Sequence, residues 1–314
     1  MFVETRQRGK QRKFYLTHAF RLEGKPKKIR RYLGANLSLD KLKKLRAEAE
    51  RHIREQMREY RQISDPFRTA LSSGEMGQLR SLAIPSSVKV LHLSEKDWRE
   101  FTQRFTYDTN AIEGSTVTYP EVREIVDKHE WPKGASKEEV SETYGVANAV
   151  AYIRRVKAHL SVEFIKKLHF LVFQNSKPYA GKLRPKGVEV VVRTASGEVV
   201  HRGAPSTKVA SLLRDLVGWY EKNKGKYPPL VLAVVVHNQF ETIHPFQDGN
   251  GRVGRLLLNS ILIRHKLPPV NIRLLNRSEY YAALQAYQRH GNIRPTVELV
   301  LKEYRQMEKQ LKKR

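Results

Sequence analysis

Cysteine is absent from this sequence of 314 residues. Disulfide bonds and thiolate metal sites are therefore excluded, and nothing in the composition points to an oxidising compartment. Long apolar runs are missing too, since no stretch approaches the roughly 18 to 20 consecutive apolar residues that span a bilayer. The N-terminus has no apolar segment of the signal-peptide kind. We therefore expect a soluble protein in the cytoplasm.

Acidic residues are few relative to basic ones. The chain has 59 Lys and Arg against 32 Asp and Glu, which gives a formal net charge of +27. Such an excess indicates polyanionic partners, for example nucleic acid, an anionic membrane or a phosphorylated ligand, without choosing among them. Residues 1–34 hold 11 Lys or Arg against 2 Glu, a net +9, so one third of the excess lies in about a tenth of the chain.

The pattern of apolar residues predicts a mainly α-helical protein. Residues 1–34 alternate aromatic or aliphatic residues with basic ones and predict a small antiparallel β-meander of three strands, followed by a charged helix from Ser38 to about Gln62. β-branched residues around a Gly-containing turn predict a β-hairpin over residues 187–205. Helical spacing predicts helices near residues 97–112, 118–129, 136–158, 161–174, 206–223, 229–242, 250–265, 278–289 and 295–312.

Twelve residues, His244 to Arg255, carry the chemistry. They combine a base, a carboxylate, a glycine-rich turn and two guanidinium groups, between two apolar helices. Gly249, Asn250 and Gly251 can adopt backbone angles that most residues cannot, so their N–H groups can form an anion site at the start of the second helix. A phosphate suits such a site.

The charged side chains of this stretch suit a metal-bound polyphosphate. Arg252 and Arg255 are three residues apart and can clamp neighbouring phosphates from one helix face. Asp248 offers an oxygen ligand for Mg²⁺, which is usually held by one or two carboxylates plus substrate phosphates. His244 can act as a general base. We interpret His237 as a packing or hydrogen-bonding histidine, because no H-E-x-x-H pattern or acidic third ligand makes a zinc site with His244.

The stretch resembles the signature of Fic-domain proteins, His-Pro-Phe-x-Asp-Gly-Asn-Gly-Arg-x-x-Arg, at every fixed position. Fic enzymes typically use Mg²⁺ and transfer AMP from ATP to a Ser, Thr or Tyr hydroxyl of a target protein. The resemblance implies a Fic-type helical bundle, with His244 as the base that deprotonates the hydroxyl and Asp248 as the metal ligand. It implies nucleotide contacts from Asp248, Gly249, Asn250, Gly251, Arg252, Val253, Gly254, Arg255, Tyr280 and Tyr281, although the two tyrosines are equally typical of a core.

Gly251 bears on the type of reaction. The Doc-type kinases of the same superfamily carry Lys at the matching position and bind the nucleotide in reverse, so glycine favours nucleotidyl transfer over phosphorylation. Removal of AMP by hydrolysis, or transfer of another nucleotide, is the alternative within enzymes. An alternative of another class is a regulator associated with nucleic acid, with an idle Fic site.

The run from Thr109 to Gly114 resembles the Fic inhibitory motif, Ser/Thr-x-x-x-Glu-Gly/Asn. The resemblance implies an ion pair between Glu113 and Arg255 that displaces the γ-phosphate of ATP and keeps the enzyme inactive. The alternative is that Glu113 simply ends a helix. On this basis we divide the chain into a meander with its linker helix (1–62), a helical region with the inhibitory helix (63–135) and the catalytic domain (136–314).

Two segments are expected to bind partners. The hairpin matches the target-docking flap of the family, which implies that Val191, Val192 and Arg193 receive an extended target segment as a neighbouring strand. The basic segment 1–34 suits nucleic acid or an acidic partner, with an ordinary solvated sheet or a homodimer contact as the alternative. No membrane partner is expected.

Overall fold

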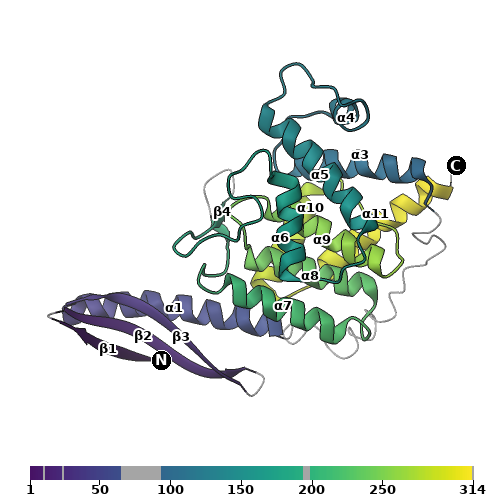
Figure 1. The fold of residues 1–314 in the computed structure, drawn as a ribbon. Coiled ribbons are helices and arrows are strands. Elements are labelled where there is room, and N and C mark those ends of the chain that lie inside the picture. Colours follow the sequence, from purple (N-terminus) through teal and green to yellow (C-terminus); the bar gives the residue numbers. More distant parts are fainter. Residues whose placement is uncertain (10, 23–24, 65–92, 194–198, 313–314) are drawn as a thin grey trace. The chain divides into compact units, whose positions relative to one another are not determined.

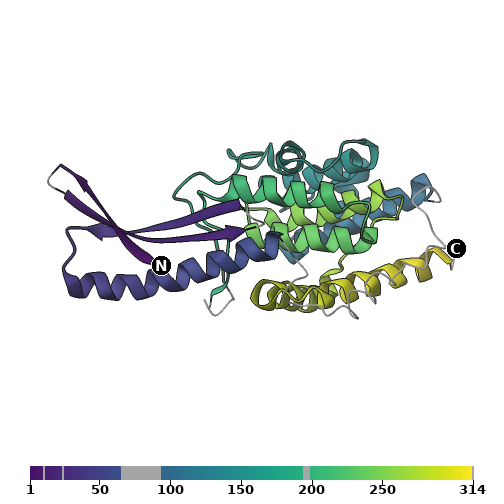
Figure 2. The same ribbon diagram turned by 90° about the horizontal axis from the view of Figure 1, so that it is seen from below.

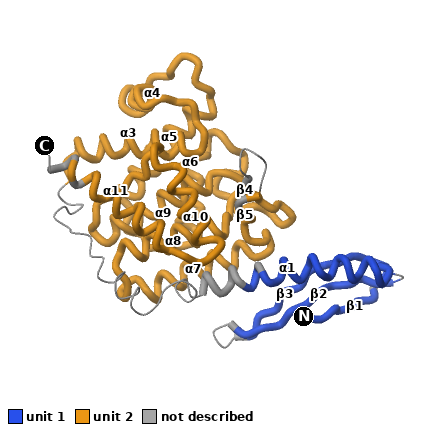
Figure 3. The backbone as a smooth tube through the Cα atoms, turned by 180° about the vertical axis from the view of Figure 1, so that it is seen from behind, with its two compact units in different colours: residues 1–66 blue, residues 67–314 orange. Residues whose placement is uncertain are grey.

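The computed structural model describes residues 1–9, 11–22, 25–64, 93–193 and 199–312. The chain forms two compact units, residues 1–66 and residues 67–314 (Figure 3). In the described part, no helix is both long enough and apolar enough to cross a membrane. The division of the chain at residues 62 and 135 stays a prediction.

The first unit is a sheet covered by one helix, and it confirms the predicted meander. Its antiparallel strands, in the order β1-β2-β3, are β1 (Phe2–Arg8), β2 (Gln11–Leu22) and β3 (Lys25–Ala35). Helix α1 (Leu39–Ser64) packs against β2 and β3. The buried apolar residues of this unit are Phe14, Leu16, Ile29, Ala49 and Ile53. They come from alternate strand positions and from one stripe of the helix, as an amphipathic sheet and helix require.

The second unit is mainly helical (Figures 1 and 2). Its helices are α3 (Glu95–Ile112), α4 (Tyr119–Arg123), α5 (Lys137–Arg155), α6 (Val162–Phe173), α7 (Val209–Asn223), α8 (Pro229–Ile243), α9 (Asn250–Arg264), α10 (Arg277–His290) and α11 (Arg294–Lys312). The predicted helices are confirmed to within a few residues at most ends. The helix expected over 118–129 is the exception, because a π-helical turn follows α4 and the chain leaves it at His129, whose φ is +59°.

Helix α8 is the central element of this unit. Every residue from Leu230 to Ile243 is buried, and the helix packs against α7, α9, α10 and α11. The helix is thus buried on all sides, although its second half carries polar residues such as His237 and Glu241. The loop that follows α8 is therefore held rigidly at its start.

The hairpin predicted over residues 187–205 is confirmed, but its strands are shorter than expected. β4 (Val191–Arg193) pairs antiparallel with β5 (Val199–Arg202), and the turn between them lies outside the described residues. Before β4, the Nη1 group of Arg184 donates a hydrogen bond to the carbonyl of Val188 (2.9 Å). A side chain thus binds the backbone where the sequence pattern predicted a strand ladder.

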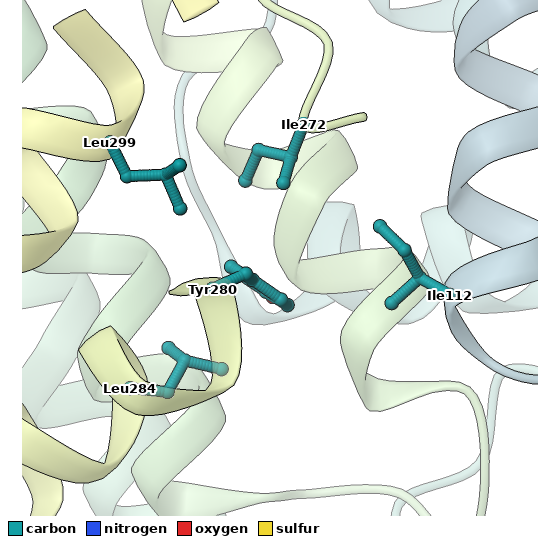
Figure 4. Close-up of a cluster of buried hydrophobic side chains, with 5 residues drawn as sticks. All are labelled: Ile112, Ile272, Tyr280, Leu284 and Leu299. Carbon is teal, nitrogen blue, oxygen red and sulfur yellow. The ribbon is translucent and has the colours of Figure 1, made fainter. Parts of the chain in front are cut away.

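The C-terminal end of α3 is anchored by a buried cluster (Figure 4). Its members are Ile112, Ile272, Tyr280, Leu284 and Leu299. Ile112 is fully buried and is the last residue of α3. The next residue, Glu113, is therefore held close to α10 by packing.

Candidate active site

The loop between α8 and α9 is shaped by its own backbone. His244 ends α8 in the left-handed region, with φ of +53° and ψ of +63°, and Gly249 precedes α9 with φ of +77°. The side chain of Asn250 braces the loop: its Oδ1 accepts a hydrogen bond from the N–H of Phe246 (2.9 Å), and its Nδ2 donates to the carbonyl of Phe246 (3.0 Å). Since Phe246 is fully buried, this brace fixes the loop to the core.

The glycines of the loop allow a close approach. A Cβ atom on Gly249 would lie 2.2 Å from the ring of Phe173, and one on Gly251 would lie 2.1 Å from Oε1 of Glu113. Gly249, the N-cap residue of α9, makes no side-chain capping hydrogen bond, and its own N–H donates to Oδ1 of Asp248 (2.6 Å). The free N–H groups of such a turn carry partial positive charge and bind anions.

His244 is held as a neutral base. Burial lowers the pKa of His244 to about 4, so its ring is uncharged near neutral pH. Its Nδ1 lies 3.2 Å from the carbonyl of Glu241, which fits a proton on Nδ1 and leaves Nε2 as the acceptor. Nε of Arg184 donates a hydrogen bond to the carbonyl of His244 (2.8 Å) and fixes the backbone of the base.

Glu241 is a buried carboxyl group beside this histidine, and sequence reasoning missed it. Its Oε2 lies 4.0 Å from Nδ1 of His244, and its Oε1 has no hydrogen-bond partner among the described residues. Burial raises the pKa of Glu241 to about 8. A carboxyl group in the second half of a helix that begins with a long apolar run is a visible signal, because buried acids are rare unless they are paired or functional.

Asp248 is the open carboxylate of the site. Its side chain is 45% exposed, and its Oδ2 lies 3.7 Å from both Nζ of Lys177 and Nη2 of Arg252. No group of three or more His, Asp or Glu that could hold a metal occurs among the described residues. A single accessible carboxylate does fit Mg²⁺, which completes its coordination with water and substrate phosphate oxygens.

Arg252 is held by a glutamate that was not predicted. Its Nη1 donates to Oε2 of Glu142 on α5, and its guanidinium lies 4.5 Å from the ring centre of Phe173. Lys177 is 3.6 Å from the other oxygen of Glu142. This network places Arg252 beside the loop with a fixed orientation.

Arg255 is held by the segment that resembles the inhibitory motif. Its Nη2 donates to Oε1 of Glu113 (2.8 Å) and to the carbonyl of Thr109 (2.9 Å), and its Nε donates to Oγ1 of Thr109 (2.7 Å). Thr109 and Glu113 are four residues apart, one turn along the end of α3, so they meet the same guanidinium. The predicted ion pair between Glu113 and Arg255 is therefore present.

The two tyrosines lie between the core and the site. Tyr280 is buried, its hydroxyl lies 3.0 Å from Nε2 of His237, and it also accepts a hydrogen bond from Nη1 of Arg255 (3.3 Å). Tyr281 donates to the carbonyl of Ile112 (3.1 Å). The interpretation of His237 as a hydrogen-bonding histidine is confirmed.

A cavity of about 530 Å³ brings most of the predicted residues together. Its lining includes Glu113, Val192, Glu241, His244, Asp248, Gly249, Asn250, Gly251, Arg255, Tyr280 and Tyr281. Arg252 instead lines a smaller neighbouring cavity, which shares Glu113 with the first. Val253 is buried in the core, and Gly254 faces Glu241 and His237. The side chain of Arg193 lies outside the described residues.

Comparison with curated proteins relates the chain to a family of transferases. A sequence model of the Fic/DOC family matches residues 159–262. A protein adenylyltransferase fic-1 of Caenorhabditis briggsae is 34% identical over 211 residues, which cover 65% of this chain and 40% of the relative. A protein adenylyltransferase Fic of Nematostella vectensis is 33% identical over 199 residues, 62% of this chain and 45% of the relative. The chain thus spans less than half the length of these relatives.

Solved structures show the same fold. A Fic-domain-containing signaling protein from Bacteroides thetaiotaomicron superposes with a TM-score of 0.62 and 26% identity, over 68% of this chain and 88% of that protein. A segment of Fic-1 from Caenorhabditis elegans gives a TM-score of 0.57 at 26% identity, over 86% of this chain and 76% of that segment. The predicted Fic-type helical fold is therefore confirmed.

Proposed function

We propose that this chain, whose residues 159–262 match the Fic/DOC family, transfers AMP from ATP to a Ser, Thr or Tyr hydroxyl of a target protein and is inhibited by Glu113. One observation carries the proposal. His244, the open carboxylate Asp248 and Arg255 face one cavity of about 530 Å³, which suits a nucleotide and a reacting hydroxyl.

In this reaction His244 acts as the general base. Its Nε2 accepts the proton of the target hydroxyl while the hydroxyl oxygen bonds to the α-phosphorus of ATP. The bond from the α-phosphorus to the bridging oxygen of the β-phosphate breaks, and pyrophosphate leaves. The neutral state of His244 near pH 7, which follows from its burial, keeps Nε2 free for this proton.

The loop and the arginines would hold the phosphates. The N–H groups at the start of α9 provide an anion site, and Arg252 lies beside them, oriented by Glu142. Asp248 would hold Mg²⁺, which neutralises charge on the phosphates when it is bound. The brace between Asn250 and Phe246 suggests that Asn250 shapes the loop and leaves the phosphate contacts to the backbone.

Inhibition follows from competition for Arg255. The guanidinium already donates to Thr109, Glu113 and Tyr280, so a γ-phosphate must displace the carboxylate to reach it. A charge-assisted hydrogen bond contributes about 1.5–3 kcal/mol, which corresponds to about 10- to 100-fold in ATP affinity. The position of Glu113 therefore supports the proposal that this residue inhibits ATP binding.

The test is intact mass spectrometry of the Glu113→Gly variant incubated with ATP and Mg²⁺. We expect self-modification by AMP at least about tenfold above the wild-type chain, since loss of the carboxylate frees Arg255. The double variant Glu113→Gly with His244→Ala is the matched control and should gain no AMP. Absence of AMP from the single variant would reject the proposal, and preference for CTP, GTP or UTP in parallel reactions would change the donor.

Removal of AMP is the alternative activity. Glu113 lines the same cavity as His244, so it could orient a water molecule toward an AMP-modified side chain. Incubation of modified target with wild-type and Glu113→Gln chains separates the two directions. Release of AMP by the wild type alone would favour hydrolysis.

The proposal also includes two segments that bind partners, the strand β4 and residues 1–34. Val192 is exposed and lines the cavity, which supports docking of an extended target segment along β4. The net charge of +9 over residues 1–34 supports recruitment of nucleic acid or an acidic partner. A homodimer and a cytoplasmic location stay predictions from the sequence.

A further inference from the structure

We propose that the helix-free face of the N-terminal sheet binds duplex DNA through the major groove. The proposal narrows the recruitment described above to one partner, and it is independent of AMP transfer. The face is defined by the register, in which Glu4, Tyr15 and Tyr32 lie opposite one another across the three strands. Helix α1 covers the other face, where Phe14, Leu16 and Ile29 are buried.

This helix-free face is strongly basic. Residues paired across the strands point to the same side of a sheet, and next-but-one residues share it. Among the residues whose side chains the structure describes, the cations that the register places on this face are Arg6, Lys13, Arg21, Lys28 and Arg30. Glu4, which pairs with Tyr15, is an acidic residue on the same face, so these five described cations minus one carboxylate give a net +4. Charge complementarity therefore favours a polyanion.

Contacts with Tyr15 and Glu4 fix the orientation of two arginines on this face, Arg6 and Arg30. Arg6 and Arg30 lie over the ring of Tyr15, 5.7 and 5.9 Å from its centre, and both also bind Glu4. Arginines fixed in this way lose less conformational entropy when they bind phosphates or the O6 and N7 atoms of guanine. The arrangement suits recognition of a rigid surface.

The dimensions of the sheet fit the major groove of a DNA duplex better than the other grooves of DNA and RNA duplexes. Two neighbouring strands, about 4.8 Å apart, form a ribbon of the width that the roughly 12 Å major groove of B-DNA admits. The minor groove, about 6 Å wide, is too narrow. The major groove of an RNA duplex is deep and narrow, which excludes the same insertion.

Single-stranded nucleic acid fits this face less well. Proteins that bind single strands stack bases on free aromatic rings. Here the ring of Tyr15 is occupied by two guanidiniums, and Tyr32 is tilted by 51° against it. The two tyrosines therefore offer no flat platform for successive bases.

Fluorescence anisotropy of the full chain with a labelled 20-base-pair DNA, without ATP, tests the proposal. We expect binding that weakens steeply between 50 and 200 mM salt. Lys28→Ala with Arg30→Ala should weaken binding at least about tenfold and lower the salt slope by about 2, since each phosphate contact contributes about 0.9. The matched control is Lys27→Ala with Arg31→Ala, the residues of the same strand that point to the helix-covered side, and it should change affinity less than about threefold.

Three outcomes would overturn the proposal. One is equal loss of affinity in the two double variants, which would mean that only net charge matters. Another is tighter binding of single-stranded DNA, duplex RNA or polyglutamate than of the DNA duplex. The third is an unchanged affinity in Arg6→Gln, a single change that serves as a second variant if Lys28→Ala with Arg30→Ala does not fold. AMP transfer is measured separately, so its failure would not be confused with any of these results.

Discussion

Each motif arginine is paired with a glutamate from another helix segment. Arg255 binds Glu113, which follows α3, and Arg252 binds Glu142 of α5. The two pairs differ in exposure: the side chain of Glu113 is 30% exposed, whereas that of Glu142 is 11% exposed. The more exposed partner is easier for a phosphate to displace, because water can solvate the released carboxylate. We therefore propose that Glu113 inhibits nucleotide binding, whereas Glu142 orients the guanidinium of Arg252.

Glu241 gives a prediction about stability. Burial raises the pKa of Glu241 from 4.5 to about 8, so between these values the native chain holds a proton that the unfolded chain has released. Stability is therefore lost as the pH rises through this window, and Glu241→Gln should remove that loss. We expect the variant to gain on the order of 4 kcal/mol over wild type near pH 8 and about 1 kcal/mol near pH 5.

Urea unfolding of both proteins at the two pH values measures this gain. Glu163→Gln, a change at an exposed carboxylate of α6, is the control and should show no such dependence on pH. The comparison between variants cancels the effect of the buried histidines, whose lowered pKa values destabilise the native state in acid. An equal difference between wild type and Glu241→Gln at both pH values would contradict the prediction.

Among the elements, the end of α3 connects core packing to the proposed inhibitory contact between Glu113 and Arg255. Thr109 and Glu113, which bind Arg255, lie on the same turn as Ile112, which is fixed in the cluster of Figure 4. Tyr281 adds a hydrogen bond to the carbonyl of Ile112. The position of the inhibitory carboxylate thus depends on apolar contacts with α10 and α11.

Ile112→Ala should therefore weaken inhibition. Loss of a buried isoleucine side chain costs about 2–5 kcal/mol and leaves a cavity under the end of α3. We expect AMP incorporation above wild type but below Glu113→Gly, measured by intact mass. Leu213→Ala, a buried change in α7, is the control and should reduce stability without raising incorporation. Equal incorporation in the two alanine variants would show that general loosening is the cause.

For the whole molecule, the two compact units predict that AMP transfer and partner binding, as proposed, can be separated. The first unit has its own core around Leu16 and Ile29, and the site lies entirely in the second. Leu16→Ala should destabilise the first unit by about 2–5 kcal/mol and leave self-modification in the Glu113→Gly background unchanged. Thermal unfolding together with intact mass spectrometry checks both effects. A parallel loss of AMP incorporation would show that the units depend on each other.

Much of the fold and the catalytic loop could be predicted from local sequence. Periodicity located the meander, most helices and the hairpin, because apolar spacing reflects which face of an element is buried. His244, Asp248 and Arg252 lie within nine consecutive residues, so their proximity follows from chain connectivity. The ion pair between Glu113 and Arg255 could be predicted from a motif in which Thr109 and Glu113 are four residues apart, about one helical turn.

Contacts between residues that are far apart in the sequence could not be predicted, because they form only in the tertiary structure. Glu142 meets Arg252 across 110 positions, and no local pattern distinguishes it from the other acids of α5. Glu241 is close in sequence, but its protonation depends on burial by surrounding helices. Likewise, the alternation of residues 1–34 indicates a sheet, whereas the face covered by α1 decides which arginines reach a partner. The sequence by itself determines which residues lie together within one helix, strand or loop, because local spacing fixes their positions. Burial and the pairing of distant residues are decided only when the helices and strands pack together.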